Sequence, residues 1–341
     1  MPFVPQRVFF EAGTLDYPIG KRILDSFKAN PKVSIYMLNE KQRITNKPGA
    51  SLEDAYRLGK KTLVVGFRKT LTFQSCKPSA HYQLPLVTGC MGQCEYCYLN
   101  TQFGKNPYIR VYVNLEEILN QTARYIEQRK PAITLFEGAA TSDPIPVEPY
   151  THSLTGAIRF FADQEHARFR FVTKYTDVDS LLSLNHRGNT TIRFSINADD
   201  IIRNYEHFTP GIIPRLQAAS KIAQAGYPLG FIIGPVILFN GWERAYQGML
   251  EEVAKHLNGH RNDRISFEII SHRFTSRAKN TILGLNPSCS LPMEEGERKY
   301  KYGQFGYGKY VYQPEQMESI QDYFSRAVPA FLPRSNINYI I

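Results

Sequence analysis

Strand-like and helix-like segments alternate regularly between about residue 83 and residue 270, and this pattern limits the fold more than any other feature. Six apolar stretches read as strands, at residues 82–88, 132–136, 169–174, 191–197, 229–238 and 264–270. Helical patterns lie among them, at 114–129, after residue 150, at 214–226 and at 243–257. Strands joined by helices indicate a parallel sheet, and six of them fit an α/β fold of the partial (β/α)6 TIM-type barrel kind.

The sequence on either side of this alternation is organised differently. Residues 1–82 predict a small N-terminal α/β region, with a helix over 51–59 that starts at Ser51 and has Asp54 three residues on. We assign residues 83–285 to the partial barrel and residues 286–341 to a C-terminal part. That part contains a β-hairpin over 299–313, a helix over 314–328 and an apolar tail.

The charge balance favours a polyanionic partner. The 341 residues carry a formal net charge of +10, which favours a partner such as nucleic acid or an anionic surface. The aromatic residues are 21 Tyr, 21 Phe and one Trp. The longest apolar run, around Gly234 and Pro235, is shorter than the roughly 20 residues that a membrane span needs. The first ten residues lack the pattern of a signal peptide. We therefore expect a cytoplasmic protein whose thiols stay reduced.

Three of the five cysteines, Cys90, Cys94 and Cys97, fall within eight positions in the stretch CMGQCEYC. The C-x3-C-x2-C spacing differs from the paired knuckles of a structural zinc site. Three thiolates can hold three irons of a [4Fe-4S] cluster and leave the fourth iron open. The alternative is a zinc site or a non-catalytic cluster with a fourth ligand such as Cys76 or Cys289, both of which we interpret as buried thiols.

This motif, with an aromatic residue at Tyr96 and a place in the first loop of a partial barrel, resembles the radical S-adenosylmethionine (radical SAM) superfamily. The resemblance implies that the open iron takes the amino and carboxylate groups of SAM. It also implies that reduction of the iron-sulfur cluster cleaves SAM to methionine and a 5′-deoxyadenosyl radical.

Polar residues end the later strands, where SAM would lie. We expect Lys174 to bind the methionyl carboxylate, Ser142 to reach the methionyl end, and the turn at Gly234 to approach the adenine. The full candidate set is Ser142, Asp143, Lys174, Ser195, Asn197 and Gly234. Ser195 and Asn197 would bind ribose hydroxyls, although each member of the set could also be a strand-end residue that faces water.

A finer resemblance, to the spore photoproduct lyase family, covers nearly the whole chain. Its basis is the stretch CMGQCEYCYL, the stretch FEGAATSDP and the aromatic and basic hairpin. The family implies a DNA repair lyase that splits 5-thyminyl-5,6-dihydrothymine, a form of DNA damage, into two thymines. In this family a cysteine after the second strand gives a hydrogen atom to the product radical, and two tyrosines, here Tyr96 and Tyr98, relay the radical back to SAM.

The donor cysteine does not match, because this chain has Ala140 where the family reads Cys-Thr-Ser-Asp. A methyl group offers no weak S–H bond, so we expect the reaction to begin but to finish poorly. One explanation is an engineered variant made to trap substrate. The other is a natural homologue that uses a different donor.

The C-terminal hairpin suits DNA in which the two thymines are swung out of the helix. We expect phosphate contacts from Lys301 and Lys309, and wedging or stacking by aromatic side chains. These aromatic residues are Tyr302, Phe305, Tyr307 and Tyr310. Arg273 belongs to a second basic candidate, and the alternative is a hairpin that only caps the barrel.

The family also implies an electron donor of flavodoxin or ferredoxin type and a bacterial spore or germinating cell as the setting. We expect a monomer. Two other functions stay open at this point: another radical SAM enzyme that acts on RNA or a peptide, and a non-catalytic iron-sulfur or zinc protein that binds nucleic acid.

Overall fold

The computed structural model describes residues 2–44, 51–104, 106–259, 265–302 and 308–341. Its chain forms two compact units. The first contains residues 1–91 and 103–192, and the second contains residues 92–102 and 193–341. These two units do not test the division into three parts that the sequence predicts, and that division stays a prediction.

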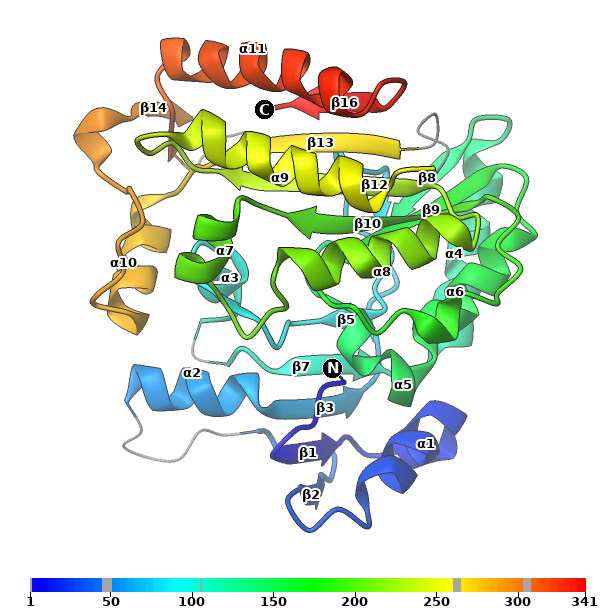
Figure 1. Ribbon diagram of the computed structural model, residues 1–341. Helices are drawn as coiled ribbons and strands as arrows, with labels where there is room; N and C mark the ends of the chain where they lie inside the picture. Colours follow the sequence, from blue (N-terminus) through cyan, green and yellow to red (C-terminus); the bar gives the residue numbers. More distant parts are fainter. Residues whose placement is uncertain (1, 45–50, 105, 260–264, 303–307) are drawn as a thin grey trace. The chain divides into compact units, whose positions relative to one another are not determined.

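The first unit begins with a five-stranded sheet in the order β2-β1-β3-β7-β5 (Figure 1). Strands β1 (Arg7–Phe10), β2 (Ser34–Met37), β3 (Thr62–Gly66) and β7 (Ile109–Tyr112) are parallel, and β5 (Val87–Thr88) runs antiparallel to β7. Helices α1 (Pro18–Phe27) and α2 (Leu52–Lys60) connect the first strands. The Ser51 hydroxyl accepts a hydrogen bond from Asp54 N at 3.0 Å, which confirms the predicted helix start.

The same unit contains the first barrel strands. Strands β4 (Tyr82–Gln83), β8 (Thr134–Glu137) and β9 (Ala167–Thr173) pair in parallel. Helices α4 (Leu115–Arg129), α5 (Glu148–Thr151) and α6 (Ser153–Ala162) accompany them. Phe136, Phe161 and Phe169 are fully buried, and the rings of Phe161 and Phe169 stack at 5.1 Å. Phe136 on β8 and Phe169 on β9 thus bury against Phe161 of α6, and this burial stabilises the packing of the helix on the two strands.

The first predicted strand is wrong in its extent. Residues 82–88 do not form one strand that leads into Cys90, because β4 and β5 belong to different sheets. Pro85 lies between them, and proline has no N–H to donate to a sheet. Cys90 therefore follows a strand of the N-terminal sheet rather than the first barrel strand.

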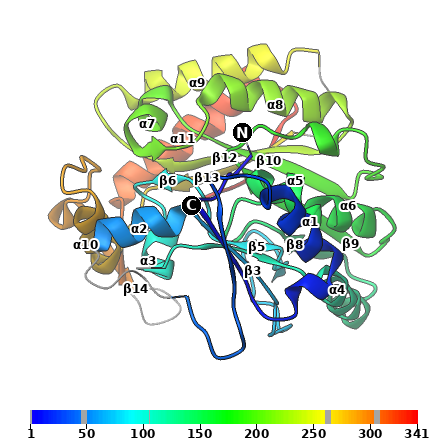
Figure 2. The same ribbon diagram turned by 90° about the horizontal axis from the view of Figure 1, so that it is seen from below.

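The second unit continues the alternation after β10 (Thr190–Ile196), which begins in the first unit. Strands β12 (Leu229–Val236), β13 (Ile265–Ser271) and β16 (Asn336–Ile340) pair in parallel. Helices α8 (Ile212–Gln224) and α9 (Trp242–His256) lie side by side, and α9 also contacts α11 (Pro314–Phe331) (Figures 1 and 2). The apolar tail is thus a strand, and its place beside β13 depends on contacts distant in sequence.

Shorter elements complete the second unit. They are β6 (Gln93–Cys94), α3 (Leu99–Phe103, whose last residue lies in the first unit), α7 (Asp199–Tyr205), β11 (Glu206–His207) and α10 (Ser276–Leu285). The sequence analysis did not predict β7, α3, α7 or α10. The predicted hairpin is confirmed, because β14 (Lys299–Tyr302) and β15 (Gly308–Val311) pair antiparallel.

Candidate active site

Within the first unit, the loop that carries Cys90 is held against the loop that follows β8. Gly89 N donates to Thr141 O at 2.9 Å, and Gly89 forms a bridge with Ser142. Gly89 has φ of 81°, and a Cβ there would lie 2.2 Å from Tyr108 O, so only glycine fits. The structure therefore brings the backbone next to Cys90 against the loop that contains Ala140 and Ser142.

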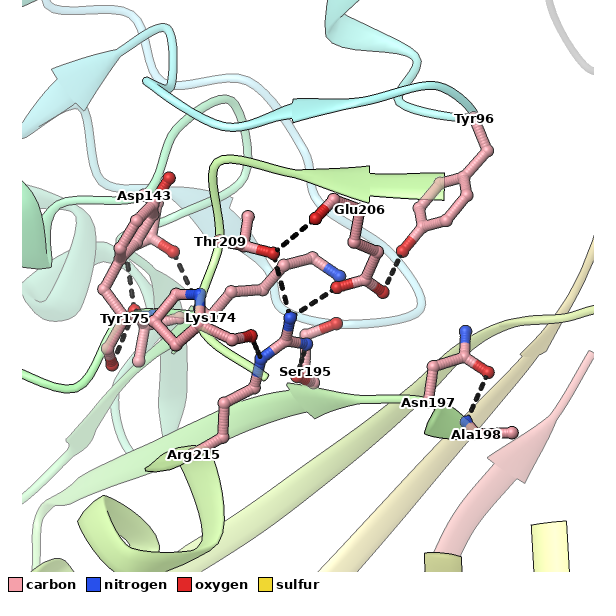
Figure 3. A network of polar contacts seen from close by, with 12 residues as sticks. Tyr96, Asp143, Lys174, Tyr175, Ser195, Asn197, Ala198, Glu206, Thr209 and Arg215 are labelled. Carbon is pink, nitrogen blue, oxygen red and sulfur yellow. Dashed lines mark hydrogen bonds and ion pairs between the residues drawn. The ribbon is translucent and has the colours of Figure 1, made fainter. Parts of the chain in front are cut away.

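Asp143 is a buried clamp between the ends of β8 and β9. Its carboxylate accepts hydrogen bonds from Thr173 Oγ1 at 2.8 Å, Lys174 N at 2.8 Å and Ile145 N at 3.3 Å (Figure 3). Burial raises the pKa of Asp143 to about 6, although the three hydrogen bonds oppose that shift. Asp143 thus positions Lys174 through its backbone. The sequence analysis missed Thr173, whose hydroxyl bonds give no periodic signal.

Ser142 has the feature expected of a ligand contact. It is 9% exposed, and its Oγ is buried without a hydrogen-bond partner among the described residues. A buried hydroxyl without a partner is costly, so an acceptor or donor from a bound molecule would stabilise it. Ser142 therefore fits a polar ligand such as the methionyl end of SAM.

In the second unit, Glu206 lies at the centre of a buried ionic network. Its carboxylate accepts from Arg215 Nη2 at 2.6 Å and from the Tyr96 hydroxyl (Figure 3). Arg215 also donates to Ser195 O at 2.8 Å, so the network ties the end of β10 to the cysteine loop. Burial, followed by the charge of Glu206, raises the pKa of the Tyr96 phenol well above its usual value.

The second half of the cysteine motif is fixed by strand pairing. Cys94 in β6 pairs with Glu206 in β11, and Glu95 N donates to Tyr205 O at 2.9 Å. Cys97 N donates to Cys94 O at 3.1 Å, which closes a tight turn. The two tyrosines differ, because Tyr96 is held by Glu206 whereas Tyr98 is 57% exposed. Sequence reasoning missed Glu206 and Arg215, since neither lies in a motif.

No disulfide joins the five cysteines, all of which lie in the described residues, with Cys90 in the first unit and Cys94 and Cys97 in the second. Over the described ranges, no three His, Cys, Asp or Glu side chains form a group that could hold a metal ion. A [4Fe-4S] cluster spreads its thiolates over different irons, so its ligands need not converge on one point. Burial, and then Glu95, raises the pKa of the Cys289 thiol to about 12, which disfavours the thiolate that binds metal.

Asn197 and Gly234 lie where the sequence placed them, at the ends of β10 and β12. Asn197 Nδ2 donates to Pro235 O at 2.8 Å, and its Oδ1 accepts from Ala198 N and the Tyr246 hydroxyl. Asn197 is fully buried, so any ribose contact must use its other amide hydrogen. Gly234 precedes a cis peptide bond to Pro235.

The hairpin gathers positive charge. Lys301 pairs directly opposite Lys309, whose pKa is lowered by burial and then by the charges of Arg273 and Lys301. Tyr302 is 77% exposed, whereas Tyr310 stacks on Phe274 at 5.3 Å. Tyr302 is therefore the better placed of these two for a base. Phe305 and Tyr307 lie outside the described residues.

The fold and site first define a class: an α/β protein of the partial-barrel kind with three clustered cysteines at its candidate site. The family model described as spore photoproduct lyase matches residues 3–341. The chain belongs to the spore photoproduct lyase family, which is a family of lyases.

Similar proteins cover this chain from end to end. Spore photoproduct lyase from Clostridium acetobutylicum is 49% identical over 336 residues, and the match covers 98% of both chains. The Bacillus subtilis protein is 44% identical over 338 residues, or 99% of this chain and 98% of the relative. A structure of a spore photoproduct lyase double mutant, with bound AdoMet and dinucleoside spore photoproduct, is 45% identical with a TM-score of 0.96 over all of both chains. This likeness confirms the predicted fold class.

No helix in the described part of the chain is long and apolar enough to cross a membrane.

Proposed function

We propose that this chain repairs DNA by splitting the spore photoproduct into two thymines with a bound [4Fe-4S] cluster and SAM. The observation that carries the proposal is the end-to-end match to the lyase family. The related double mutant binds AdoMet and the dinucleoside lesion. When bound, the cluster and SAM would supply the one-electron chemistry that starts repair. The rival functions, on RNA or a peptide or as a binding module, have no such match behind them.

The candidate site residues have different proposed roles. Cys90, Cys94 and Cys97 would hold the cluster, and Ser142 would bond the methionyl end of SAM through its unsatisfied hydroxyl. Asp143 would position Lys174 for the carboxylate. Ser195, Asn197 and Gly234 would contact the nucleoside, while Lys301, Lys309 and Arg273 would bind DNA phosphates and Tyr302 would contact a base.

The missing donor has a candidate replacement in Cys76. The related structure is a double mutant in which the cysteine at position 140 is replaced by alanine and the serine at position 76 by cysteine. This chain carries both residues, Ala140 and Cys76, while being only 45% identical to that protein. We therefore favour a natural homologue with a different donor over an engineered variant.

A single buried carboxylate joins the two loops concerned. Glu137 Oε1 accepts from Ala139 N at 3.2 Å, next to Ala140, and Glu137 Oε2 accepts from Ser79 Oγ at 3.2 Å. Ser79 lies in the turn that Cys76 closes with Ala80, where Ala80 N donates to Cys76 O at 2.9 Å. Cys76 is half-buried. The turn that carries Cys76 is thus anchored beside the loop that lacks the donor.

The proposed step moves one hydrogen atom. The S–H bond of Cys76 breaks homolytically, a C–H bond forms on the thymine allyl radical, and the sulfur keeps the unpaired electron. The return of a hydrogen atom to that sulfur would fall to Tyr98 or Tyr96, of which Tyr98 is 57% exposed and Tyr96 donates to Glu206.

The test is anaerobic incubation with SAM, a strong reductant and a lesion-bearing dinucleotide, with thymine formed per SAM consumed as the readout. We expect Cys76→Ser to lower that ratio at least tenfold, and Ala140→Cys to restore it in the Cys76→Ser background. Cys289→Ser is the matched control and should leave the ratio unchanged.

An unchanged ratio in Cys76→Ser would remove the donor assignment but leave the lyase function. Absence of thymine from the unmodified chain and from Ala140→Cys would refute the function itself.

A further inference from the structure

A pocket lies in the N-terminal sheet of the first unit, at the carboxyl ends of β1, β2 and β3. It has a volume of about 920 Å3. The chain passes from β1 to β2 on one side and then to β3 on the other side, so β1 is a point where the strand order reverses. Crevices at the carboxyl ends of strands at such a point are where open α/β sheets bind ligands.

This pocket is separate from the site of the cysteines. Strand β5 runs antiparallel to β7, with Val87 opposite Val111 and Thr88 opposite Arg110. Cys90 therefore follows toward the amino end of β7. Most of the pocket lining lies at the carboxyl ends of the strands, at residues such as Glu11, Phe67 and Tyr112, and Tyr108 and Arg110 extend it toward the amino end of β7. None of the candidate SAM or cluster residues lines it.

The pocket is positively charged. Four cationic side chains line it against two acidic ones, Glu11 and Glu40. Glu11 is already paired with Arg110. Arg43 donates to two carbonyl oxygens, Glu40 O at 3.2 Å and Gln42 O at 3.3 Å, and such bonds leave its charge uncompensated. The balance favours an anionic ligand.

Hydrogen bonds fix the backbone of Arg68, whereas the Nε of its side chain has no hydrogen-bond partner in the described structure. Asn114 clamps its backbone from both sides, accepting from Arg68 N at 2.9 Å and donating to Arg68 O at 3.2 Å. The Arg68 guanidinium lies 5.9 Å from the centre of the Tyr112 ring. Its Nε is buried and has no hydrogen-bond partner in the described structure. A buried donor of this kind calls for an acceptor.

We propose that this pocket binds a phosphate ester, with the Nε and terminal nitrogen of Arg68 forming a fork to two phosphate oxygens. Guanidinium forks match phosphate geometry, and a lysine ammonium does not. Lys69 and Arg43 add charge, and the half-buried ring of Tyr108 offers a surface for a base. The ester comes either from a DNA backbone, a source that rests on the proposed function, or from a free nucleotide, a source that does not.

The test uses the full chain and two lesion-free probes. A fluorescent single-stranded thymidine oligonucleotide is followed by anisotropy, and thymidine 5′-monophosphate by calorimetry, with thymidine as the phosphate-free control. We expect Arg68→Lys, which keeps the charge but loses the fork, to weaken binding of at least one phosphate probe about tenfold, the range expected for a charge-assisted hydrogen bond. Lys69→Ala provides a second variant at an exposed side chain, and Lys32→Ala, an exposed cation outside the pocket, should have less than a twofold effect.

The outcomes separate the sources. Weaker oligonucleotide binding alone identifies the DNA backbone, and weaker monophosphate binding identifies a free nucleotide. Unchanged affinity of both probes in Arg68→Lys and Lys69→Ala overturns the proposal. Because neither probe contains the lesion, failure of lesion repair would not affect these readings.

Discussion

Two buried carboxylates, Asp143 in the first unit and Glu206 in the second, have similar structural roles but different electrostatic surroundings. Each joins the end of a barrel strand to a neighbouring loop (Figure 3). Glu206 has a full counter-charge in Arg215, and both side chains have 0% exposure. Asp143 depends mainly on neutral donors, from Thr173, Lys174 N and Ile145 N. Burial raises the pKa of Asp143 to about 6, whereas Glu206 is paired with a buried cation.

The raised pKa of Asp143 indicates that its part of the site is sensitive to pH. The Glu206 carboxylate accepts from the Arg215 guanidinium and from the Tyr96 hydroxyl, so a buried cation holds that network together. Asp143 lies close to its protonation midpoint, and its carboxylate holds the backbone beside Lys174. The loop expected to contact SAM is thus the part whose geometry depends on a proton.

The largest effect is expected when the counter-charge of Glu206 is removed. Arg215→Met leaves a buried carboxylate unpaired, which typically costs about 3–5 kcal/mol. It also removes the bond to Ser195 O. We expect a large fall in the urea midpoint of unfolding.

Arg203→Met is the matched control, because Arg203 is exposed and its ion pairs with Asp199 and Asp200 lie at the surface. Its midpoint should stay close to that of the unmodified chain. A midpoint for Arg215→Met equal to that of this control would show that the ion pair is unimportant.

The next prediction concerns pH, with Asp143 as the titrating group. Its pKa rises from 3.8 unfolded to about 6 folded, so the folded state holds the proton more tightly. The contribution to stability is present in full below about pH 4 and is lost as pH rises through about 6. A shift of this size corresponds to about 3 kcal/mol between the two limits.

The measurement is the difference in unfolding free energy between the unmodified chain and Asp143→Asn at several pH values from 5 to 7. We expect the unmodified chain to gain stability relative to the variant as pH falls. Asp163→Asn, a surface carboxylate paired with Arg187, should show no such trend. A difference for Asp143→Asn that does not vary with pH would mean that Asp143 stays ionised throughout.

Much of the fold could be predicted from the sequence, and the errors have identifiable causes. Long amphipathic helices such as α4 and α9 and the buried strands β9 and β12 follow from local periodicity. The tail was predicted only as apolar and not as strand β16, because Asn336 and Asn338 interrupt its apolar residues and its pairing with β13 depends on contacts distant in sequence. The break at Pro85 was visible in the sequence, but apolar neighbours on both sides masked it.

Some residues of the candidate site could likewise be predicted from the sequence, and others could not. Ser142, Asp143 and Lys174 could be placed because they directly follow strands whose ends converge. Glu206 and Arg215 could not, since a buried ion pair between distant segments leaves no local pattern. The anchoring of the Cys76 turn by Glu137 is equally invisible, because Ser79 and Glu137 are 58 positions apart.

The smallest effect is expected at Tyr96, and it sharpens the comparison because it removes the hydrogen bond and keeps the ion pair. Tyr96→Phe deletes the phenol that donates to Glu206 while Arg215 stays in place. Loss of a hydrogen bond to a charged group costs roughly 1.5–3 kcal/mol, and the remaining ion pair should keep the cost at the lower end. We expect a modest fall in the urea midpoint, smaller than that of Arg215→Met.

The same variant distinguishes a structural tyrosine from a radical relay. Tyr98→Phe is the matched change at an exposed position, so it should not alter stability, but it should lower the thymine formed per SAM consumed if Tyr98 carries the relay. Tyr96→Phe should then reduce stability with little change in that ratio. The opposite pattern, with Tyr96→Phe lowering the ratio and Tyr98→Phe having no effect, would move the relay to the buried tyrosine and make Glu206 its proton acceptor.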